Sequence, residues 1–120
     1  MSTLLQECQA ALADANVQAF LRVIREGETD QTDAAYRTIV GGGLFDSFDD
    51  HPRKFVYVQL FNVRSSAAGA YQFLSRTWDE CAAALQLPDF SPAMQDLAAV
   101  FLIRRRGALA DVIALSLIHI

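Results

Sequence analysis

The sequence is poor in the residues that mark several large classes of protein. Its 120 residues include two cysteines, Cys8 and Cys81, which lie in apolar, helix-like contexts without metal-site spacing, so we expect reduced thiols. No apolar run reaches membrane-spanning length, and the first residues lack the basic and apolar regions of a signal peptide. We therefore expect a soluble protein that is made in the cytoplasm and has no stable membrane association. The net charge is −4 and no basic run exceeds Arg104–Arg106, which argues against nucleic acid as a partner.

The chain does contain enough apolar residues for one folded domain. Hydrophobic residues make up 52% and charged residues 20% of the sequence, which excludes a disordered or low-complexity protein. In chain order, the predicted elements are helices over 3–13 and 16–27, a β lobe within 36–61, a helix over Tyr71–Leu85, and a helix that begins at Pro92, after the cap Ser91, and ends at Gly107. Finer expectations are a cap at Asp14 or Asn16, a strand over Tyr36–Val40, and an apolar stripe of Met94, Leu97, Ala98, Phe101 and Leu102. The order predicts an α+β, mostly helical domain.

The end of the chain differs from the sequence before it. Residues Leu115–Ile120 correspond to the in-frame translation of a transposon-type sequencing adapter, and no helix-end signal precedes them. We therefore expect a domain over residues 1–114 that is incomplete at its C-terminus, followed by an artefact over 115–120. His119 then carries no functional weight.

Candidates for acid–base chemistry cluster after the second predicted helix. They are Glu26, Glu28, Asp30 and Asp33. Glu28 follows Ile24 by four residues and would lie on the buried face if the helix continued, whereas Glu26 would face solvent. A carboxyl group on the core side, at the negative end of a helix, is expected to have a raised pKa, which suits a general acid. The alternative, that all four are solvated charges, stays open at this point.

Several motifs in one order resemble lambda-type endolysins of the lytic transglycosylase type, over about residues 18–111. They are Phe20-Leu21 with Gly27-Glu28-Thr29-Asp30, Tyr36-x-x-Ile39-Val40-Gly41-Gly42-x-Leu44-Phe45, Asp50-His51-Pro52-Arg53-Lys54, Ser66-x-Ala68-Gly69-x-Tyr71-Gln72-x-Leu74-Ser75-Arg76-x-Trp78-Asp79, Leu87-x-Asp89-Phe90-Ser91-Pro92-x-x-Gln95-Asp96, and Arg106-Gly107-Ala108-Leu109. The resemblance implies a lysozyme-like fold with a helical lobe, a small β-hairpin lobe and a sugar-binding cleft between them. It also implies cleavage of the β-1,4 bond between N-acetylmuramic acid and N-acetylglucosamine in peptidoglycan, with 1,6-anhydromuramic acid ends.

The resemblance also assigns roles to residues. Glu28 would be the single acid and base, with Glu26 as the second candidate. Tyr71 and Gln72 would line the cleft floor, although Tyr71 could equally pack between the lobes. Ser66 and Gly69 would shape the loop beside the cleft, Gly42 and Phe45 would form the lip over the substrate, His51 would fix a turn or contact sugar, and Trp78 would belong to the core.

The resemblance further implies peptidoglycan glycan strands as the partner, a monomer, no cofactor or metal, and action on the cell wall after release. Two departures from the family pattern stand out: Thr29 replaces the glycine after the acid, and Ala70 replaces an arginine before Tyr71. Two other functions remain open. One is a hydrolytic lysozyme in which Asp30 or Asp33 positions water. The other is a truncated, inactive remnant that only binds glycan.

Overall fold

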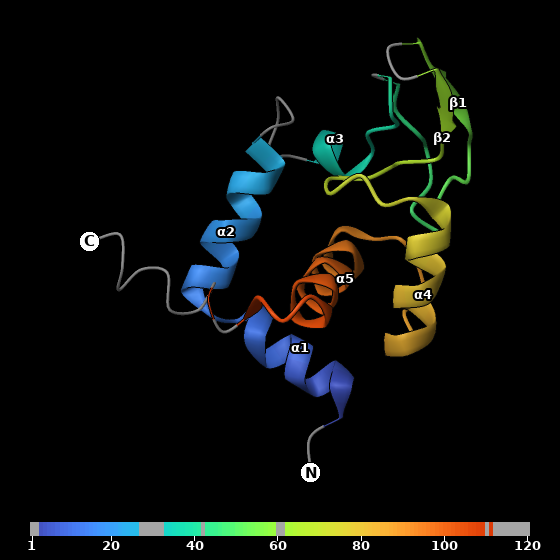
Figure 1. Ribbon diagram of the computed structural model, residues 1–120. Helices are drawn as coiled ribbons and strands as arrows, with labels where there is room; N and C mark the ends of the chain where they lie inside the picture. Colours follow the sequence, from blue (N-terminus) through green and yellow to red (C-terminus); the bar gives the residue numbers. More distant parts are fainter. Residues whose placement is uncertain (1–2, 27–32, 42, 60–61, 110, 112–120) are drawn as a thin grey trace.

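A computed structural model of the chain describes residues 3–26, 33–41, 43–59, 62–109 and 111 (Figure 1). Its helices are α1 (Leu4–Leu12), α2 (Ala15–Glu26), α3 (Asp33–Tyr36), α4 (Ser75–Leu85) and α5 (Pro92–Arg105). Strands β1 (Val56–Val58) and β2 (Val63–Ser65) form an antiparallel hairpin in which Tyr57 pairs with Arg64. This order confirms the predicted α+β, mostly helical architecture. The segment 115–120 lies outside the described residues.

Side chains fix where the first two helices begin. Thr3 and Gln6 form a capping box: the Thr3 hydroxyl accepts from the Gln6 amide at 3.1 Å, and the Gln6 side chain accepts from the Thr3 amide at 2.8 Å. At α2 the Asp14 carboxylate accepts from the amides of Asn16 and Val17, at 2.9 and 3.2 Å. Of the two predicted caps, Asp14 is therefore the one the structure uses.

Helix α5 lies at the centre of the domain, with α1, α2 and α4 arranged around it (Figure 1). The predicted apolar stripe is confirmed: Leu97 and Ala98 are buried, and Met94, Phe101 and Leu102 are half-buried against the core. Ala99 and Val100, on other faces of the helix, are buried as well. A helix surrounded by other helices buries most of its circumference, so a one-sided stripe describes it incompletely.

Aromatic rings fill the centre of the core. Trp78 on α4 meets Phe90 edge to face with ring centres 4.6 Å apart, and Phe73 lies 5.4 Å from Trp78. Trp78 is 2% exposed, as expected for a core residue. Cys8 and Cys81 are buried free thiols, as predicted.

Two predicted boundaries are wrong. The segment Tyr36–Val40 is not a strand: Tyr36 ends α3, and the next residues make isolated bridges, Thr38 with Leu44 and Ile39 with Ala68. The helix predicted from Tyr71 begins at Ser75 instead. The reason is local: Gln72 has a φ of 52°, and Phe73 turns back to exchange two backbone hydrogen bonds with Ala68, at 2.8 and 3.0 Å.

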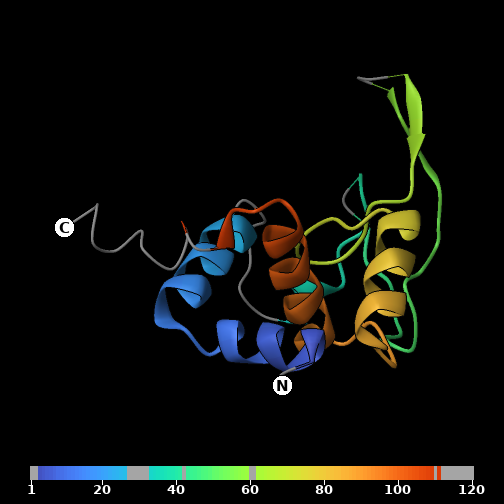
Figure 2. The ribbon, with the colours of Figure 1, turned by 60° about the horizontal axis from the view of Figure 1, so that its bottom comes forward.

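The hairpin projects away from the helical body, on the side where α4 begins (Figure 2). Val56 on its inner side meets the turn at Gly41, where a Cβ atom would lie 3.5 Å from the Val56 side chain. None of the helices among the described residues is both long and apolar enough to cross a bilayer.

Candidate active site

Two of the four candidate acids lie in described helices. Glu26 is the last residue of α2, and Asp33 is the first residue of α3. Glu28 and Asp30, between them in the sequence, lie outside the described residues. Arg25, on the last turn of α2, points its side chain into the protein, where the side chain is 15% exposed.

Four polar side chains from separate segments meet beside this helix end, and we call them the Asp96 cluster: Arg25, Tyr36, Tyr71 and Asp96. One carboxylate oxygen of Asp96 accepts from the hydroxyls of Tyr36 and Tyr71, at 2.9 and 2.5 Å. Arg25 Nη1 donates to the Tyr71 hydroxyl at 2.8 Å and lies 3.8 Å from the same Asp96 oxygen. The Nε atom of Arg25 is buried and has no hydrogen-bond partner among the described residues.

The cluster shifts the pKa values of its own members. Burial and the neighbouring Asp96 carboxylate raise the pKa of Tyr36 to about 12, and the same two causes raise the pKa of Tyr71. Burial also raises the pKa of the Asp96 carboxyl, against the opposing effect of the tyrosine hydrogen bonds and Arg25. Both phenols therefore remain protonated donors throughout the neutral range.

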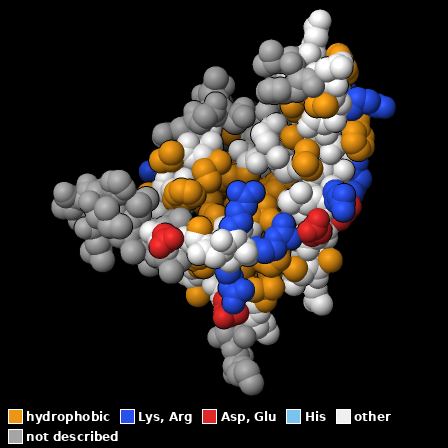
Figure 3. All heavy atoms as spheres, viewed as in Figure 1, with side chains coloured by type: hydrophobic (Ala, Val, Ile, Leu, Met, Phe, Trp, Pro, Cys, Tyr) orange, Lys and Arg blue, Asp and Glu red, His pale blue; other side chains and the backbone are white. Residues whose placement is uncertain are grey.

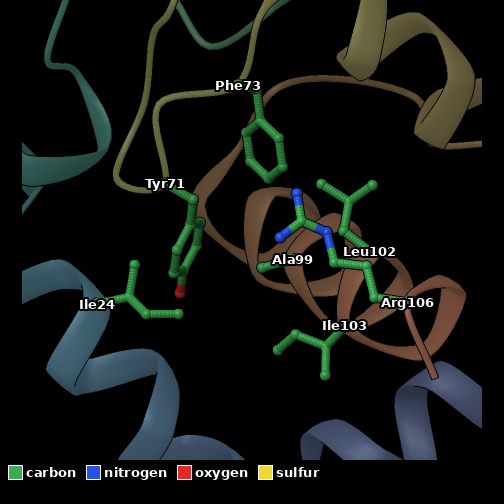
Figure 4. Close-up of a pocket in the computed structure, with 7 residues that line it drawn as sticks. All are labelled: Ile24, Tyr71, Phe73, Ala99, Leu102, Ile103 and Arg106. Carbon is green, nitrogen blue, oxygen red and sulfur yellow. The ribbon is translucent and has the colours of Figure 1, made fainter. Parts of the chain in front are cut away.

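Tyr71 also faces a small pocket between α2 and α5. Its volume is about 200 Å³, below the roughly 300–1,000 Å³ that is usual for small-molecule sites. In Figure 4 the ring of Tyr71 and the guanidinium of Arg106 both lie at this pocket. The other lining residues are Ile24, Phe73, Ala99, Leu102 and Ile103. In the space-filling view, hydrophobic side chains gather in this area and Lys and Arg side chains lie at its edge (Figure 3).

The loop before α4 is held by its own polar groups. Ser66 is 4% exposed, and its hydroxyl accepts from the Ser75 amide at 2.9 Å. The side chain of Gln72 donates to the Gly69 carbonyl at 2.8 Å. The geometry fits the prediction that Ser66 and Gly69 shape this loop. It also ties Gln72, predicted on the cleft floor, to the turn that precedes it.

Gln95 supports the same loop from α5. It is fully buried; its side-chain oxygen accepts from the Ala70 amide at 3.0 Å, and its nitrogen donates to the carbonyls of Tyr36 and Phe90, at 3.1 and 2.9 Å. Gly69 packs directly on this amide, with a φ of 85° and space for a hydrogen but not for a side chain.

In the β lobe, the structure places two predicted site residues in the interior. Phe45 is 8% exposed, and its ring packs against Phe90 at 5.7 Å between centres. His51 is 2% exposed; its Nδ1 accepts from the Arg53 amide at 2.9 Å, so Nε2 carries the hydrogen and donates to the Phe73 carbonyl at 2.7 Å. Burial lowers the pKa of His51, which keeps the ring neutral.

Phe45 and His51 therefore lie inside the β lobe. Of the two roles expected for His51, the hydrogen bonds fit the turn, because both ring nitrogens are occupied within the protein. Gly42, the other predicted lip residue, lies outside the described residues.

Sequence reasoning missed Arg25, Tyr36, Gln95 and Asp96 as members of the site. The sequence held a signal for two of them. Gln95 and Asp96 are the two polar residues in the stretch from Met94 to Leu102, which is apolar at every other position. Nothing in the spacing identifies their partners, which are far away in the chain. In the described part of the chain, no three His, Cys, Asp or Glu side chains converge as metal ligands would.

Solved structures identify the class of this fold. The chain is similar to the lysozyme from bacteriophage lambda, with a TM-score of 0.67 and 36% identity over 93% of this chain and 69% of that one. It is similarly close to bacteriophage lambda lysozyme complexed with a chitohexasaccharide, with a TM-score of 0.66 and 37% identity over 93% of this chain and 69% of that one. The fold is thus that of a phage lysozyme.

The sequence comparisons identify the family. The model of the Endolysin family matches residues 18–119, and the chain belongs to this family. It is 50% identical to the endolysin of Escherichia phage lambda over 74 residues, which are 62% of this chain and 46% of that protein. It is 38% identical to the endolysin of Escherichia phage P2 over 113 residues, which are 81% of this chain and 67% of that protein. The match therefore spans less than half the length of the lambda endolysin.

Proposed function

We propose that this chain cleaves the β-1,4 bond between N-acetylmuramic acid and N-acetylglucosamine in peptidoglycan and leaves 1,6-anhydromuramic acid ends. The observation that carries the proposal is the similarity to lambda lysozyme over 93% of this chain, because that lysozyme also has a structure with a chitohexasaccharide. A chitohexasaccharide is a chain of β-1,4-linked N-acetylglucosamine, which has the same backbone linkage as a peptidoglycan glycan strand.

In the proposed reaction Glu28 acts first as an acid and then as a base. Its carboxyl donates a proton to the glycosidic oxygen while the bond from that oxygen to C1 of the muramoyl residue breaks. The resulting carboxylate then takes the proton of the muramoyl 6-hydroxyl, whose oxygen bonds to C1. The carboxyl is regenerated and no water is consumed, so the reaction needs no second carboxylate, unlike most glycoside hydrolases.

The described residues would hold the substrate and the loop around it. Tyr71 and Gln72 are the proposed sugar-contacting residues, since both are only half-buried. The Tyr71 hydroxyl is bonded to Arg25 and Asp96, so the ring of Tyr71 is the part proposed to meet a sugar. The proposal includes a glycan strand as the partner of a monomeric enzyme and no cofactor. It also includes synthesis in the cytoplasm and action on the wall after release.

The test is mass spectrometry of the fragments released by this chain from purified peptidoglycan. The expected products end in 1,6-anhydromuramic acid, and Glu28→Gln abolishes their release. Glu7→Gln is the matched control, because Glu7 is an exposed carboxylate on α1 that pairs with Arg104 at 3.4 Å. The control is expected to keep full activity.

Other results would assign other functions. Reducing ends, one water heavier, would indicate a hydrolytic lysozyme, and replacements of Asp30 and Asp33 would then follow. Activity that survives Glu28→Gln but is lost in Glu26→Gln would move the acid to Glu26. Glycan binding without any cleavage would indicate a binding remnant, and neither binding nor cleavage would refute the proposal.

A further inference from the structure

The Asp96 cluster contacts both flanks of the segment that contains the proposed acid. Arg25 lies on the last turn of α2, just before residues 27–32, and Tyr36 lies at the end of α3, just after them. Asp96 on α5 is 2.9 Å from the Tyr36 hydroxyl and 3.8 Å from Arg25 Nη1. One carboxylate thus reaches the chain on both sides of Glu28.

The two flanks also touch each other and a third segment. The guanidinium carbon of Arg25 lies 5.8 Å from the centre of the Tyr36 ring, within the range of a cation–π contact. Tyr71 closes the arrangement: its ring meets Tyr36 edge to face at 6.4 Å, and its hydroxyl bonds both Arg25 and Asp96. Three segments, α2, α3 and the loop before α4, therefore converge on one acceptor atom of α5.

Apolar side chains would hold these segments together at a lower desolvation penalty. The side chains of Arg25 and Asp96 are 15% and 23% exposed, so both charged groups have lost most of their water. Replacing buried ion pairs with apolar residues is often neutral or stabilising, which makes such a cluster weak evidence for stability alone. A shared acceptor instead fixes orientation, because hydrogen bonds are directional and hold the groups that donate them at defined angles to each other.

We propose that Asp96 is a positioning residue that fixes the end of α2 and the end of α3 relative to each other, and with them the two flanks of the proposed acid, by holding Arg25 and Tyr36. The inference rests on the proposed function, since it presumes that Glu28 or Glu26 does the chemistry. Asp96 acts through Arg25 and Tyr36. Tyr71 has two roles, as a cluster member and as a proposed sugar contact, so Tyr36 is the cleaner partner to perturb.

The expected effect is on turnover more than on substrate binding. A misplacement of a reacting group by about 1 Å can lower a rate by roughly 100-fold. Asp96→Asn keeps the shape and one acceptor oxygen but removes the charge, and Tyr36→Phe removes a single hydrogen bond. We expect each variant to lower kcat by roughly 10- to 100-fold while KM changes by less than about threefold. The double variant should lose little more than the worse single variant, since both break one linkage.

A second measurement examines the end of α2 and the helix α3 in the absence of substrate. Hydrogen–deuterium exchange followed by mass spectrometry reports local opening at peptide resolution. In both variants, amides in peptides covering the last turn of α2 and the helix α3 should exchange faster, by roughly tenfold or more, while those of α1 and α4 stay unchanged. Glu80→Gln is the matched control: it removes a carboxylate that pairs with Arg105 of α5 at 2.8 Å on the exposed surface, and it should change neither measurement.

Each result supports or overturns the inference. Unchanged exchange at the end of α2 and in α3 would overturn it, and so would faster exchange spread evenly over the whole domain, which would indicate a purely structural role. Faster local exchange with normal kcat would also overturn it. If Asp96→Asn does not fold, Tyr36→Phe decides alone. If the unmodified chain does not cleave glycan, the proposed function fails. The exchange data then still decide whether the Asp96 cluster holds the ends of α2 and α3 together.

Discussion

Replacing Gly69 with alanine tests the support of the candidate site more directly than any other single change. Gly69 has a φ of 85°, a conformation that an alanine adopts only with strain. An added Cβ would lie 2.4 Å from the side-chain oxygen of Gln95 and 2.9 Å from Phe90. Both neighbours are fully buried, so neither can move into solvent.

The magnitude follows from three contributions. The left-handed backbone costs an alanine roughly 1–2 kcal/mol. Overpacking against buried neighbours costs roughly 1–3 kcal/mol. If Gln95 shifts to relieve the contact, the buried Ala70 amide loses its 3.0 Å hydrogen bond, at roughly 1–3 kcal/mol. Because these effects overlap, we expect a loss of roughly 3–5 kcal/mol, a large part of the roughly 5–15 kcal/mol that stabilises a typical domain.

Urea unfolding followed by far-UV circular dichroism measures this loss, and Gly107→Ala is its control. Gly107 has a similar φ of 76°, but a Cβ there would meet no atom within 4 Å. The control should therefore lose only the backbone contribution, roughly 1–2 kcal/mol. Equal losses in the two variants would refute the account of Gly69. Adding Gln95→Ala to Gly69→Ala should cost less than the two single losses added together, because the contact with the amide is then gone.

Two further predictions concern buried titratable groups. Burial lowers the pKa of His51, so below about pH 6.5 the unfolded chain takes up a proton that the folded chain does not. The free energy of unfolding should therefore be at its full value above that pH and fall by up to about 1.4 kcal/mol per pH unit below it. Urea midpoints between pH 7.5 and 5.5 measure this slope, which should be flatter in His51→Gln, and an equal slope in that variant would contradict the assignment. Cys8 and Cys81 are buried and burial raises both pKa values, that of Cys81 to about 11, so neither should react with an aromatic disulfide reagent until urea unfolds the chain. Rapid labelling of the folded protein would show that the thiols are accessible.

The parts of the fold that the sequence predicts well depend on short-range signals. Thr3 and Asp14 begin helices because their side chains reach amides two or three residues ahead, and Ser91-Pro92 marks the start of α5 in the same local way. The helix boundary predicted at Tyr71 failed for the opposite reason. Its composition suits a helix, but the pairing of Phe73 with Ala68 holds the segment in a turn.

The candidate site was predictable only in part for a related reason. Helix phase and motif resemblance point to the end of α2, and the loop with Ser66 and Gly69 is correctly predicted as a turn. The Asp96 cluster depends on hydrogen bonds between residues that lie 25 to 60 positions apart, as in the bonds from Tyr71 and Tyr36 to Asp96. Hydrophobic periodicity predicts which face of a helix is buried and carries no information on which distant polar group it meets.

Two adjacent residues on α5, Gln95 and Asp96, both bind Tyr36 at the end of α3 and the loop before α4. Gln95 donates to the Tyr36 carbonyl and accepts from the Ala70 amide, whereas Asp96 accepts from the Tyr36 hydroxyl and from Tyr71. Successive helical residues point about 100° apart, so one turn of a central helix can address the backbone of Tyr36 with one side chain and its phenol with the next. The same turn of α5 therefore binds both the loop at Gly69 and the C-terminal end of α3. A displacement of that turn would move both together, so the relative placement of Tyr71 and α3 depends on α5 more than on the backbone of either segment.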